Sequence, residues 1–385
     1  MQKGPLRIAV LGAGPVGIEA ALYAKTCGHA VTVYERGQVG EHLARWGHAK
    51  MFTPFGANVS PLGLTSLLRE KRPKDIPAES DLLTGRQFRE AYLVPLSESE
   101  ALIESMHPQN LVMQVGRATS VKKSDPDESL AFRLLIRSLS GNTERIETAD
   151  AILDCTGVNM SPNWLGDGGL PAVGEIAARP HIPHMLEDVL GERKDYYAGR
   201  SIVLVGGGYS AAATICQLAA LAEDHPATWV FWLTHGPRGA PLPRIPNDPW
   251  KDRDKLAAKA NSLATRCDGN LEFHPQTQLD EVICHGPDKG FRVAGKSNGR
   301  PVSWDVDRVI GATGFRADLR LSGALKVEDP AGRVETREPG YFILGSKTFG
   351  RDPGFFLKDS FDQIRRVFAI LGGNPRLDLY AKRAA

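Results

Sequence analysis

The sequence has only five cysteines in 385 residues, and no two of them have the spacing typical of a metal site or a redox pair. They are Cys27, Cys155, Cys216, Cys267 and Cys284, so no two stand in a C-x-x-C or C-x-x-x-x-C arrangement. This spacing argues against a disulfide framework, a cysteine zinc site and a dithiol redox centre. The ten histidines also lack metal-ligand spacing, so we expect no metal site.

Long apolar runs and an excess of one charge are absent as well. Lysine and arginine number 47 and aspartate and glutamate 45, a net charge of +2, which demands neither nucleic acid nor a membrane as partner. No apolar run has the length of a membrane span, and the N-terminus has no signal-peptide core. The lack of these segments predicts a cytoplasmic location. With 42% hydrophobic residues, the composition predicts a globular protein, and the length suits two domains.

A glycine-rich turn between two apolar runs stands near the N-terminus. The first run leads into Gly12, Gly14 and Gly17, an alanine-rich stretch follows, and the second run ends at Glu35. This order is typical of a βαβ dinucleotide-binding unit. The glycines permit a tight turn, close approach to a pyrophosphate and close packing of helix on strand, and the acid accepts the ribose hydroxyls.

The same pattern recurs at Gly206, Gly208 and Ala211, again followed by an alanine-rich helix and an apolar strand. Here the second strand runs into His235 without a carboxylate, and Arg238 follows shortly. A missing acid with a nearby cation favours a 2′-phosphate over a free ribose hydroxyl. Two such units require two dinucleotides, so we assign FAD to the first and NADPH to the second.

The remaining elements predict an α/β fold with two Rossmann-like dinucleotide-binding domains, the NAD(P)-binding domain inserted into the FAD-binding domain. The pattern predicts a helix over 86–106, strands over 111–115, 119–122, 132–137, 149–155, 307–311 and 340–345, and an amphipathic helix over 357–371. The expected FAD-binding domain comprises residues 1–172 and 301–385. The expected NAD(P)-binding domain comprises residues 173–300, bounded by glycine-rich and proline-containing turns.

The candidate site residues lie in the two glycine-rich fingerprints and in other segments that we expect to contact the same dinucleotides. For FAD they are Gly12, Gly14, Pro15, Val16, Gly17, Glu35, Arg36, Trp46, Ala118, Thr156, Gly157, Gly345, Ser346 and Leu357. For NADPH they are Gly206, Gly208, Tyr209, Ser210, Ala211, His235 and Arg238. The Thr-Gly pair after the strand 307–311, which is Thr313 and Gly314, completes the set of cofactor-binding candidates. Backbone N–H groups at the start of a helix near Leu357 are expected to face the flavin pyrimidine, where negative charge develops on reduction.

Two residues of the loop after Glu35 leave alternatives open. Trp46 either packs on the flavin or belongs to the core beneath a long loop. His48 is the one catalytic candidate, as a hydrogen-bonding group or proton shuttle at the flavin ring, and the alternative is a structural hydrogen bond.

The two fingerprints, with Thr-Gly turns at Thr156–Gly157 and Thr313–Gly314, resemble those of the two-dinucleotide-binding-domain flavoproteins. That superfamily includes thioredoxin-reductase-like and glutathione-reductase-like enzymes and the class B flavin monooxygenases. The segment Ala312–Phe315 is similar to the A-T-G-[FY] linker of N-hydroxylating monooxygenases. The lack of a cysteine pair, and Gly345–Ser346 where reductases carry Gly-Asp, favour the monooxygenase branch. The F-x-G-x-x-x-H signature is degenerate, because only its histidine, His184, is present.

The resemblance implies an FAD-dependent NADPH oxidoreductase, a small-molecule flavin monooxygenase that uses a flavin C4a-(hydro)peroxide. Its partners would be a small-molecule substrate and oxygen. The alternative is a reductase that passes electrons to a quinone, a disulfide or a carrier without its own cysteine pair. A non-catalytic nucleotide sensor is a third class, disfavoured because a sensor needs only one fingerprint. The substrate and the oligomeric state, homodimer included, stay open.

Overall fold

The computed structural model describes residues 4–70, 76–118, 131–237, 239–266, 269–286, 288–327, 332–349 and 354–381. The chain forms two compact units, of which unit 1 comprises Met1–Ser161 and Arg316–Ala385 and unit 2 comprises Pro162–Phe315. Both are α/β units with a parallel sheet, which confirms the predicted fold class. Among the described residues, no helix has both the length and the hydropathy needed to cross a bilayer.

The boundaries between the units differ from the expected ones, at 161/162 and 315/316 instead of 172/173 and 300/301. The glycine-rich segment Gly166–Pro171 is not a crossing. The carboxylate of Glu175 accepts three backbone N–H groups between residues 165 and 172, which ties this segment into unit 2. Residues 301–315 belong to unit 2 because they supply most of one antiparallel strand and a whole strand of its parallel sheet.

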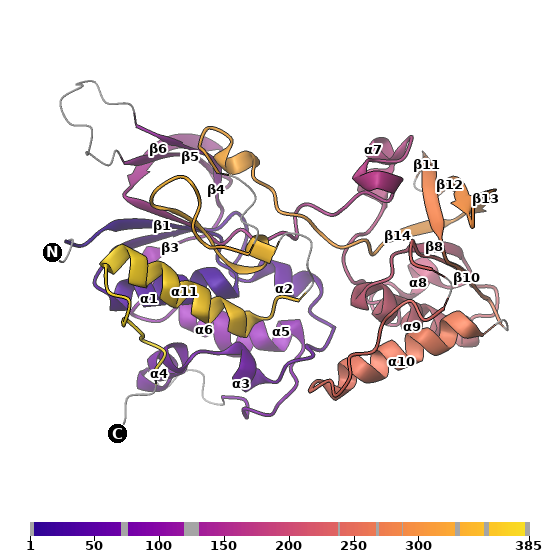
Figure 1. Cartoon of the computed structure of the whole chain (residues 1–385), viewed down its shortest axis with the longest axis horizontal. Helices are drawn as coiled ribbons and strands as arrows, with labels where there is room; N and C mark the ends of the chain where they lie inside the picture. Colours follow the sequence, from indigo (N-terminus) through magenta and orange to yellow (C-terminus); the bar gives the residue numbers. More distant parts are fainter. Residues whose placement is uncertain are drawn as a thin grey trace. The chain divides into compact units, whose positions relative to one another are not determined.

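Unit 1 is built on a five-stranded parallel sheet with strand order β15-β7-β1-β2-β3. Its strands are β1 (Arg7–Leu11), β2 (Ala30–Tyr34), β3 (Met106–His107), β7 (Ala151–Asp154) and β15 (Tyr341–Ile343). The helices α1 (Pro15–Thr26) and α11 (Leu357–Gly372) lie side by side on one face (Figure 1). The antiparallel strands β4 (Asn110–Arg117), β5 (Phe132–Ser138) and β6 (Thr143–Ala149) cover the other.

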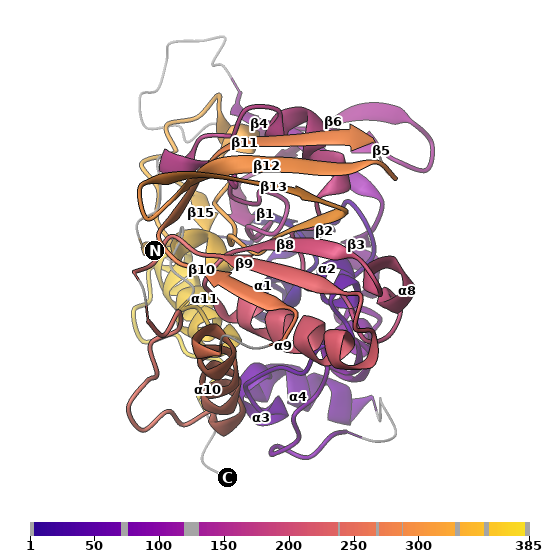
Figure 2. The same ribbon diagram turned by 90° about the vertical axis from the view of Figure 1, so that its right-hand side faces the viewer.

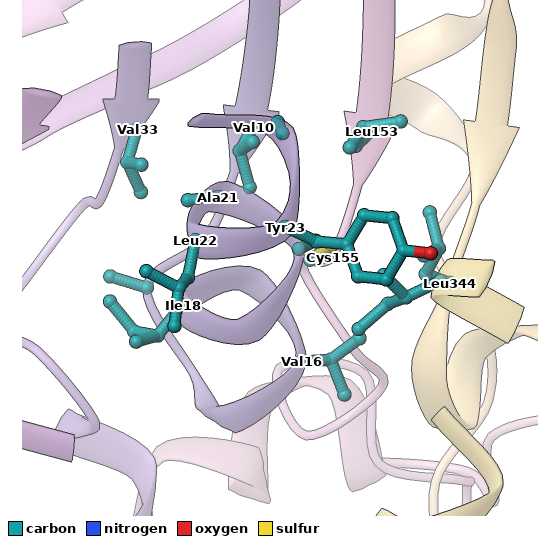
Figure 3. Packing of buried hydrophobic residues seen from close by; sticks show 14 of the residues in the cluster. Val10, Val16, Ile18, Ala21, Leu22, Tyr23, Val33, Leu153, Cys155 and Leu344 are labelled. Carbon is teal, nitrogen blue, oxygen red and sulfur yellow. The ribbon is translucent and has the colours of Figure 1, made fainter. Parts of the chain in front are cut away.

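Burial of both faces of this sheet explains why β1 and β7 are apolar at nearly every position. In β1, Ile8 and Val10 pack with the helices, and Figure 3 shows side chains of β1, β2, β7 and α1 meeting there. The alternate residues Ala9 and Leu11 pack against β4 and β5. A strand buried on both faces has no polar alternation, as is usual in a parallel sheet covered on both sides.

The helical segment of unit 1 corrects one prediction. Its elements are α2 (Glu41–Arg45), α3 (Phe55–Asn58), α4 (Pro61–Arg69), α5 (Gly85–Phe88), the π-helical turn η1 (Arg89–Leu93), α6 (Val94–Ser97) and η2 (Ile103–Ser105). The expected helix over 86–106 therefore ends at Ser97. The hydroxyls of Ser97 and Ser99 donate to the carbonyls of Val94 and Leu96, and such local bonds compete with helix continuation.

The strand predictions are met in most places. The expected strand 111–115 is part of the longer β4, and the expected strand 119–122 lies outside the described residues. The final helix spans Leu357–Gly372, one residue longer than predicted. The strands β3 and β6 were not predicted, nor were those of unit 2 over 271–274, 277–286, 290–297 and 300–306.

Unit 2 repeats the three layers of unit 1. Its parallel sheet has strand order β10-β9-β8-β14, made of β10 (Leu271–His274), β9 (Trp229–Leu233), β8 (Ser201–Val205) and β14 (Arg308–Gly311). The helices α9 (Tyr209–Asp224) and α10 (Lys251–Thr265) pack on one face. The antiparallel strands β11 (Thr277–Gly286), β12 (Gly290–Ser297) and β13 (Arg300–Val306) cover the other face (Figure 2). Short elements complete the unit: η3 (Asp167–Gly169), α7 (Glu175–Ala178), η4 (Arg179–His181) and α8 (Lys194–Tyr197).

Candidate dinucleotide-binding sites

The turn after β1 has space only for glycine at two of its three fingerprint positions. Gly12 has φ +97°, and a Cβ there would lie 2.8 Å from the carbonyl oxygen of Cys155. A Cβ at Gly17 would overlap the carbonyl oxygen of Gly12. These two glycines are therefore required by the fold itself.

Gly14 has a different environment. It is the N-cap of α1, and no described atom lies within 4 Å of where its Cβ would be. Pro15 and Val16 follow in the first turn, and no side chain of the described residues caps the helix. The start of α1 thus presents an open backbone surface at the positive end of the helix dipole, which suits a pyrophosphate.

Glu35 lies directly after β2 at the same edge of the sheet. Its carboxylate accepts the N–H of Ala13 and the N–H of Gly37, both at 2.7 Å. Two hydrogen bonds fix the carboxylate beside the glycine turn and leave acceptor capacity for a ribose diol. The next residue, Arg36, has its guanidinium 3.1 Å from the sulfur of Met160.

Three predicted segments meet at the carboxyl edge of the unit 1 sheet. A Cβ at Gly345 (φ +77°) would lie 3.2 Å from a methyl group of Val16, in the first turn of α1. A Cβ at Gly157 (φ +65°) would lie 3.9 Å from the hydroxyl of Ser346. The structure therefore brings together the glycine turn, Thr156–Gly157 and Gly345–Ser346, which lie far apart in the sequence.

Some backbone donors expected to face the flavin are used within the protein. The N–H of Gly345 donates to Oε1 of Gln363 at 2.6 Å. The N–H of Ala118 donates to the carbonyl of Ala131 at 3.0 Å and extends the β4–β5 pairing. At the start of α11, one residue before Leu357, the N–H of Phe356 donates to Asp359 at 2.7 Å. This acidic side chain in the first turn offsets the positive helix end that we expected to act on the flavin.

The loop residues Trp46 and His48 are placed by packing. The Trp46 ring packs against the core, and a Cβ at Gly85 would lie 2.7 Å from it, which favours the core alternative. Nε2 of His48 is buried without a hydrogen-bond partner among the described residues. In helix α2, earlier in the same loop, burial lowers the pKa of His42 to about 4, so that ring is neutral at pH 7.

The turn after β8 in unit 2 repeats the geometry of the first. Gly206 has φ +138°, and a Cβ there would overlap the carbonyl oxygen of Ala312. Gly208 is the N-cap of α9, and no described atom lies within 4 Å of its Cβ position. The next three residues form the first turn of the helix; they are Tyr209, Ser210 and Ala211.

The strand end that would face the adenosine ribose carries no acid. Thr234 is buried, and Nδ1 of His235 lies 3.7 Å from a carboxylate oxygen of Asp167. Arg238 lies outside the described residues. Arg244, in the same loop, is occupied by a two-point ion pair with Asp254, at 2.7 Å from its Nε.

The segment after β14 is held by a residue that the sequence did not single out. Asn163 donates from its side chain to the carbonyl of Thr313 at 3.0 Å and from its backbone to the carbonyl of Gly314 at 2.9 Å. The hydroxyl of Thr313 donates back to the carbonyl of Asn163. The ring of His184 packs against Gly311, and burial lowers its pKa to about 4. These contacts define the shape of the Thr313–Gly314 turn.

None of the described cysteines is placed as a reactive thiol pair. Cys155 is buried behind the glycine turn, and burial raises the pKa of its thiol. Burial also raises the pKa of Cys27 to about 11. Cys267 lies outside the described residues. Within the described ranges, no group of three or more histidines, cysteines or acids is placed to hold a metal ion.

A buried charged network at the same edge of unit 1 was missed by the sequence analysis. Lys347 is bonded to Asp154 with 2.7 Å between Nζ and Oδ2, and the hydroxyl of Tyr341 donates to the same oxygen at 2.9 Å. The only sequence signal is the single acid that ends the apolar run 151–153. Its partners lie almost 200 residues away, beyond the reach of a spacing argument.

No protein-family model and no curated protein matches the sequence. Solved structures match nearly its whole length. The bacillithiol disulfide reductase Bdr from Bacillus cereus has 17% sequence identity and a TM-score of 0.69, over 96% of this chain and 99% of that one. The ornithine hydroxylase PvdA from Pseudomonas aeruginosa has 14% identity and a TM-score of 0.68, over 96% and 99%.

The cadaverine monooxygenase DfoA from Erwinia amylovora, solved with FAD bound, has 14% identity and a TM-score of 0.66, over 100% of this chain and 99% of that one. The fold is therefore that of the two-dinucleotide-binding-domain flavoproteins, as the sequence resemblance predicted. Because a reductase, a hydroxylase and a monooxygenase share it, the fold does not distinguish between these reactions.

Proposed function

We propose that the chain is an FAD-dependent NADPH oxidoreductase, with FAD in unit 1 and NADPH in unit 2. This proposal depends on the two glycine turns. In each, a Cβ at the first glycine would collide with a backbone carbonyl, whereas a Cβ at the second glycine would meet no described atom. In each, the second glycine caps a helix of at least 12 residues and faces open space. Open backbone at a helix start is the feature that a pyrophosphate needs.

The ends of the second strands support the assignment of one nucleotide to each unit. In unit 1 the Glu35 carboxylate is fixed beside the turn by two backbone donors. In unit 2 Thr234 and His235 stand at the equivalent place, where a carboxylate would repel a 2′-phosphate. The chemistry that FAD supplies when bound is two-electron transfer between a reduced nicotinamide and an acceptor.

For the acceptor we propose oxygen: NADPH supplies two electrons, one atom of O2 is transferred to a small-molecule nucleophile, and the other atom leaves as water. The raised pKa values of Cys27 and Cys155 keep these thiols protonated, and the described cysteines form no pair. A protein thiol is therefore disfavoured as the electron acceptor. The same choice is supported by the shared fold of PvdA, an ornithine hydroxylase, and DfoA, a cadaverine monooxygenase.

A reductase is the second candidate, because the Bdr structure, a disulfide reductase, has the same fold. Stopped-flow spectroscopy separates the two. The FAD-loaded protein is reduced with NADPH under nitrogen and then mixed with air-saturated buffer, with and without an amine or thioether. Oxygen uptake equal to NADPH consumption, together with an oxygenated product, supports the monooxygenase. If a disulfide or quinone is reduced under nitrogen as fast as NADPH is consumed in air, and no oxygenated product forms in air, the reductase is supported.

A further inference from the structure

Lys347 is the one lysine among the fully buried side chains of the described residues. Only 1% of its side chain is exposed, and its Nζ donates to Oδ2 of Asp154 at 2.7 Å and to the hydroxyl oxygen of Thr156 at 3.1 Å. A buried ion pair costs desolvation free energy and is often no more stable than an apolar replacement. Stability of the core is therefore a weak explanation for this pair.

The acceptor Asp154 is fully used by donors from both sides. One carboxylate oxygen accepts the N–H and the hydroxyl of Thr156, at 3.2 and 2.6 Å. The other accepts Lys347 and the hydroxyl of Tyr341. The carboxylate thus orients Thr156 on one side and two residues of a different chain segment on the other.

The network joins the ends of two neighbouring strands. Asp154 is the last residue of β7, and Lys347 lies in the turn η6 (Gly345–Phe349), just after β15. Gln363 of α11 holds the same turn from the other side, accepting the N–H of Gly345 and donating to the hydroxyl of Thr348. Lys347 therefore ties Thr156–Gly157 to Gly345–Ser346 at the edge that carries the glycine turn.

We propose that Lys347 and Asp154 form a positioning pair for the dinucleotide site of unit 1. This inference rests on the proposed FAD site. Because the ammonium group is covered by protein, it acts through Thr156 and the backbone of residues 345–347 and does not contact the ligand. The pair holds the two turns at a fixed separation, so that both face the dinucleotide without reorganisation when it binds.

The test measures FAD affinity of the apoprotein by fluorescence titration, at a temperature at which circular dichroism shows each variant folded. Lys347→Met removes the tie at similar volume, and we expect it to weaken FAD binding by about tenfold or more, the loss typical of a charge-assisted hydrogen bond. The matched control is Glu338→Gln. Glu338 is bonded to Arg117 at 2.7 Å and lies before β15, at the opposite end of that strand. We expect this variant to keep wild-type affinity.

The double variant Lys347→Met/Asp154→Asn keeps the proposal testable if the single variant does not fold, because it leaves no buried unpaired charge. We expect it to fold, to bind FAD more weakly than the wild type, and to give the bound flavin a broadened visible absorption spectrum. Wild-type affinity and spectrum in a folded Lys347 variant would overturn the positioning role. Failure of the wild type itself to bind FAD would refute the proposed function instead.

Discussion

A Cβ at position 17 would overlap the carbonyl oxygen of Gly12, whereas no described atom lies within 4 Å of a Cβ at position 14. Within one turn, therefore, Gly17 is required for helix α1 to pack on the turn, whereas no contact among the described residues requires glycine at position 14. The space at Gly14 is what a ligand would use. This difference allows folding and binding to be tested separately.

Gly14→Val should abolish FAD binding and leave the apoprotein folded. The residue has φ −76°, which any amino acid adopts, and the side chain would occupy the space assigned to the pyrophosphate. The measurement is FAD titration combined with thermal unfolding of the apoprotein. Gly17→Val is the control, and we expect it to lower the free energy of unfolding by about 3 kcal/mol or more through steric overlap. Retention of full yellow colour by Gly14→Val would contradict the FAD assignment.

Gly208→Val should leave FAD bound but block reduction by NADPH. Gly208 corresponds to Gly14 in unit 2, with φ −92° and open space around its Cβ position. The measurement is the rate of flavin bleaching on mixing with NADPH under nitrogen. Reduction by dithionite should be unchanged, which shows that the flavin itself remains competent. A variant that NADPH reduces at the wild-type rate would refute the nucleotide site in unit 2.

Arg238→Ala should raise the KM for NADPH and hardly change that for NADH. The prediction depends on the sequence, because a cation follows a strand end that has no carboxylate. A charge-assisted contact to phosphate is worth about 1.5–3 kcal/mol, which is a ten- to hundredfold change. Arg244→Ala is the matched control from the same loop, since Arg244 is already paired with Asp254. Equal use of NADPH and NADH by the wild type would contradict the preference.

Replacement of all five cysteines by alanine should preserve turnover wherever the protein folds. The pKa of Cys27 is raised to about 11 by burial, so at pH 8 only roughly one molecule in a thousand carries the reactive thiolate there. NADPH oxidation and oxygen uptake are the readouts, with thiol titration of the folded wild type as a check on burial. We expect any loss to come from packing at Cys155, behind the glycine turn. Turnover that disappears in a stably folded variant would support a thiol acceptor.

In the wild type, we expect the free energy of unfolding to fall as the pH rises because of Glu19, and we expect Glu19→Gln to abolish this decrease. Glu19 lies in α1, is buried, and accepts hydroxyl donors from Tyr92 and Ser60. Burial raises its pKa above the ordinary 4.5, partly opposed by these hydroxyls. Between about pH 4.5 and this raised pKa the folded state keeps a proton that the unfolded state has released, so the free energy of unfolding falls as the pH rises through that range.

Chemical unfolding at several pH values measures this slope. Glu41→Gln is the control with the opposite sign, because the hydrogen bond from Arg45 lowers the pKa of Glu41. The stability that Glu41 contributes is present above its unfolded pKa and is lost as the pH falls. Equal slopes for Glu19→Gln and the wild type would show that Glu19 is not a raised-pKa group.

The sequence by itself determined the parts of this protein in which the physical requirement is local. Gly12–Gly17 and Gly206–Ala211 each combine a turn, a close backbone approach and a helix start within six residues, so the pattern is legible without a structure. The apolar runs 8–11 and 202–205 likewise predicted the strands that lead into these two turns. The final helix was predicted to within one residue, because its apolar face repeats with the period of the helix.

Only the tertiary structure decided where the units are divided and which distant residues meet. The Glu175 carboxylate accepts three hydrogen bonds that hold the glycine-rich segment before it in unit 2. No local sequence pattern predicts these bonds. Lys347 and Asp154 meet because β7 and β15 are neighbours in the sheet, although 193 residues separate them in the chain. Local geometry is encoded in local sequence. Which strands become neighbours depends instead on burying both faces of the whole sheet, and this burial exists only in the folded protein.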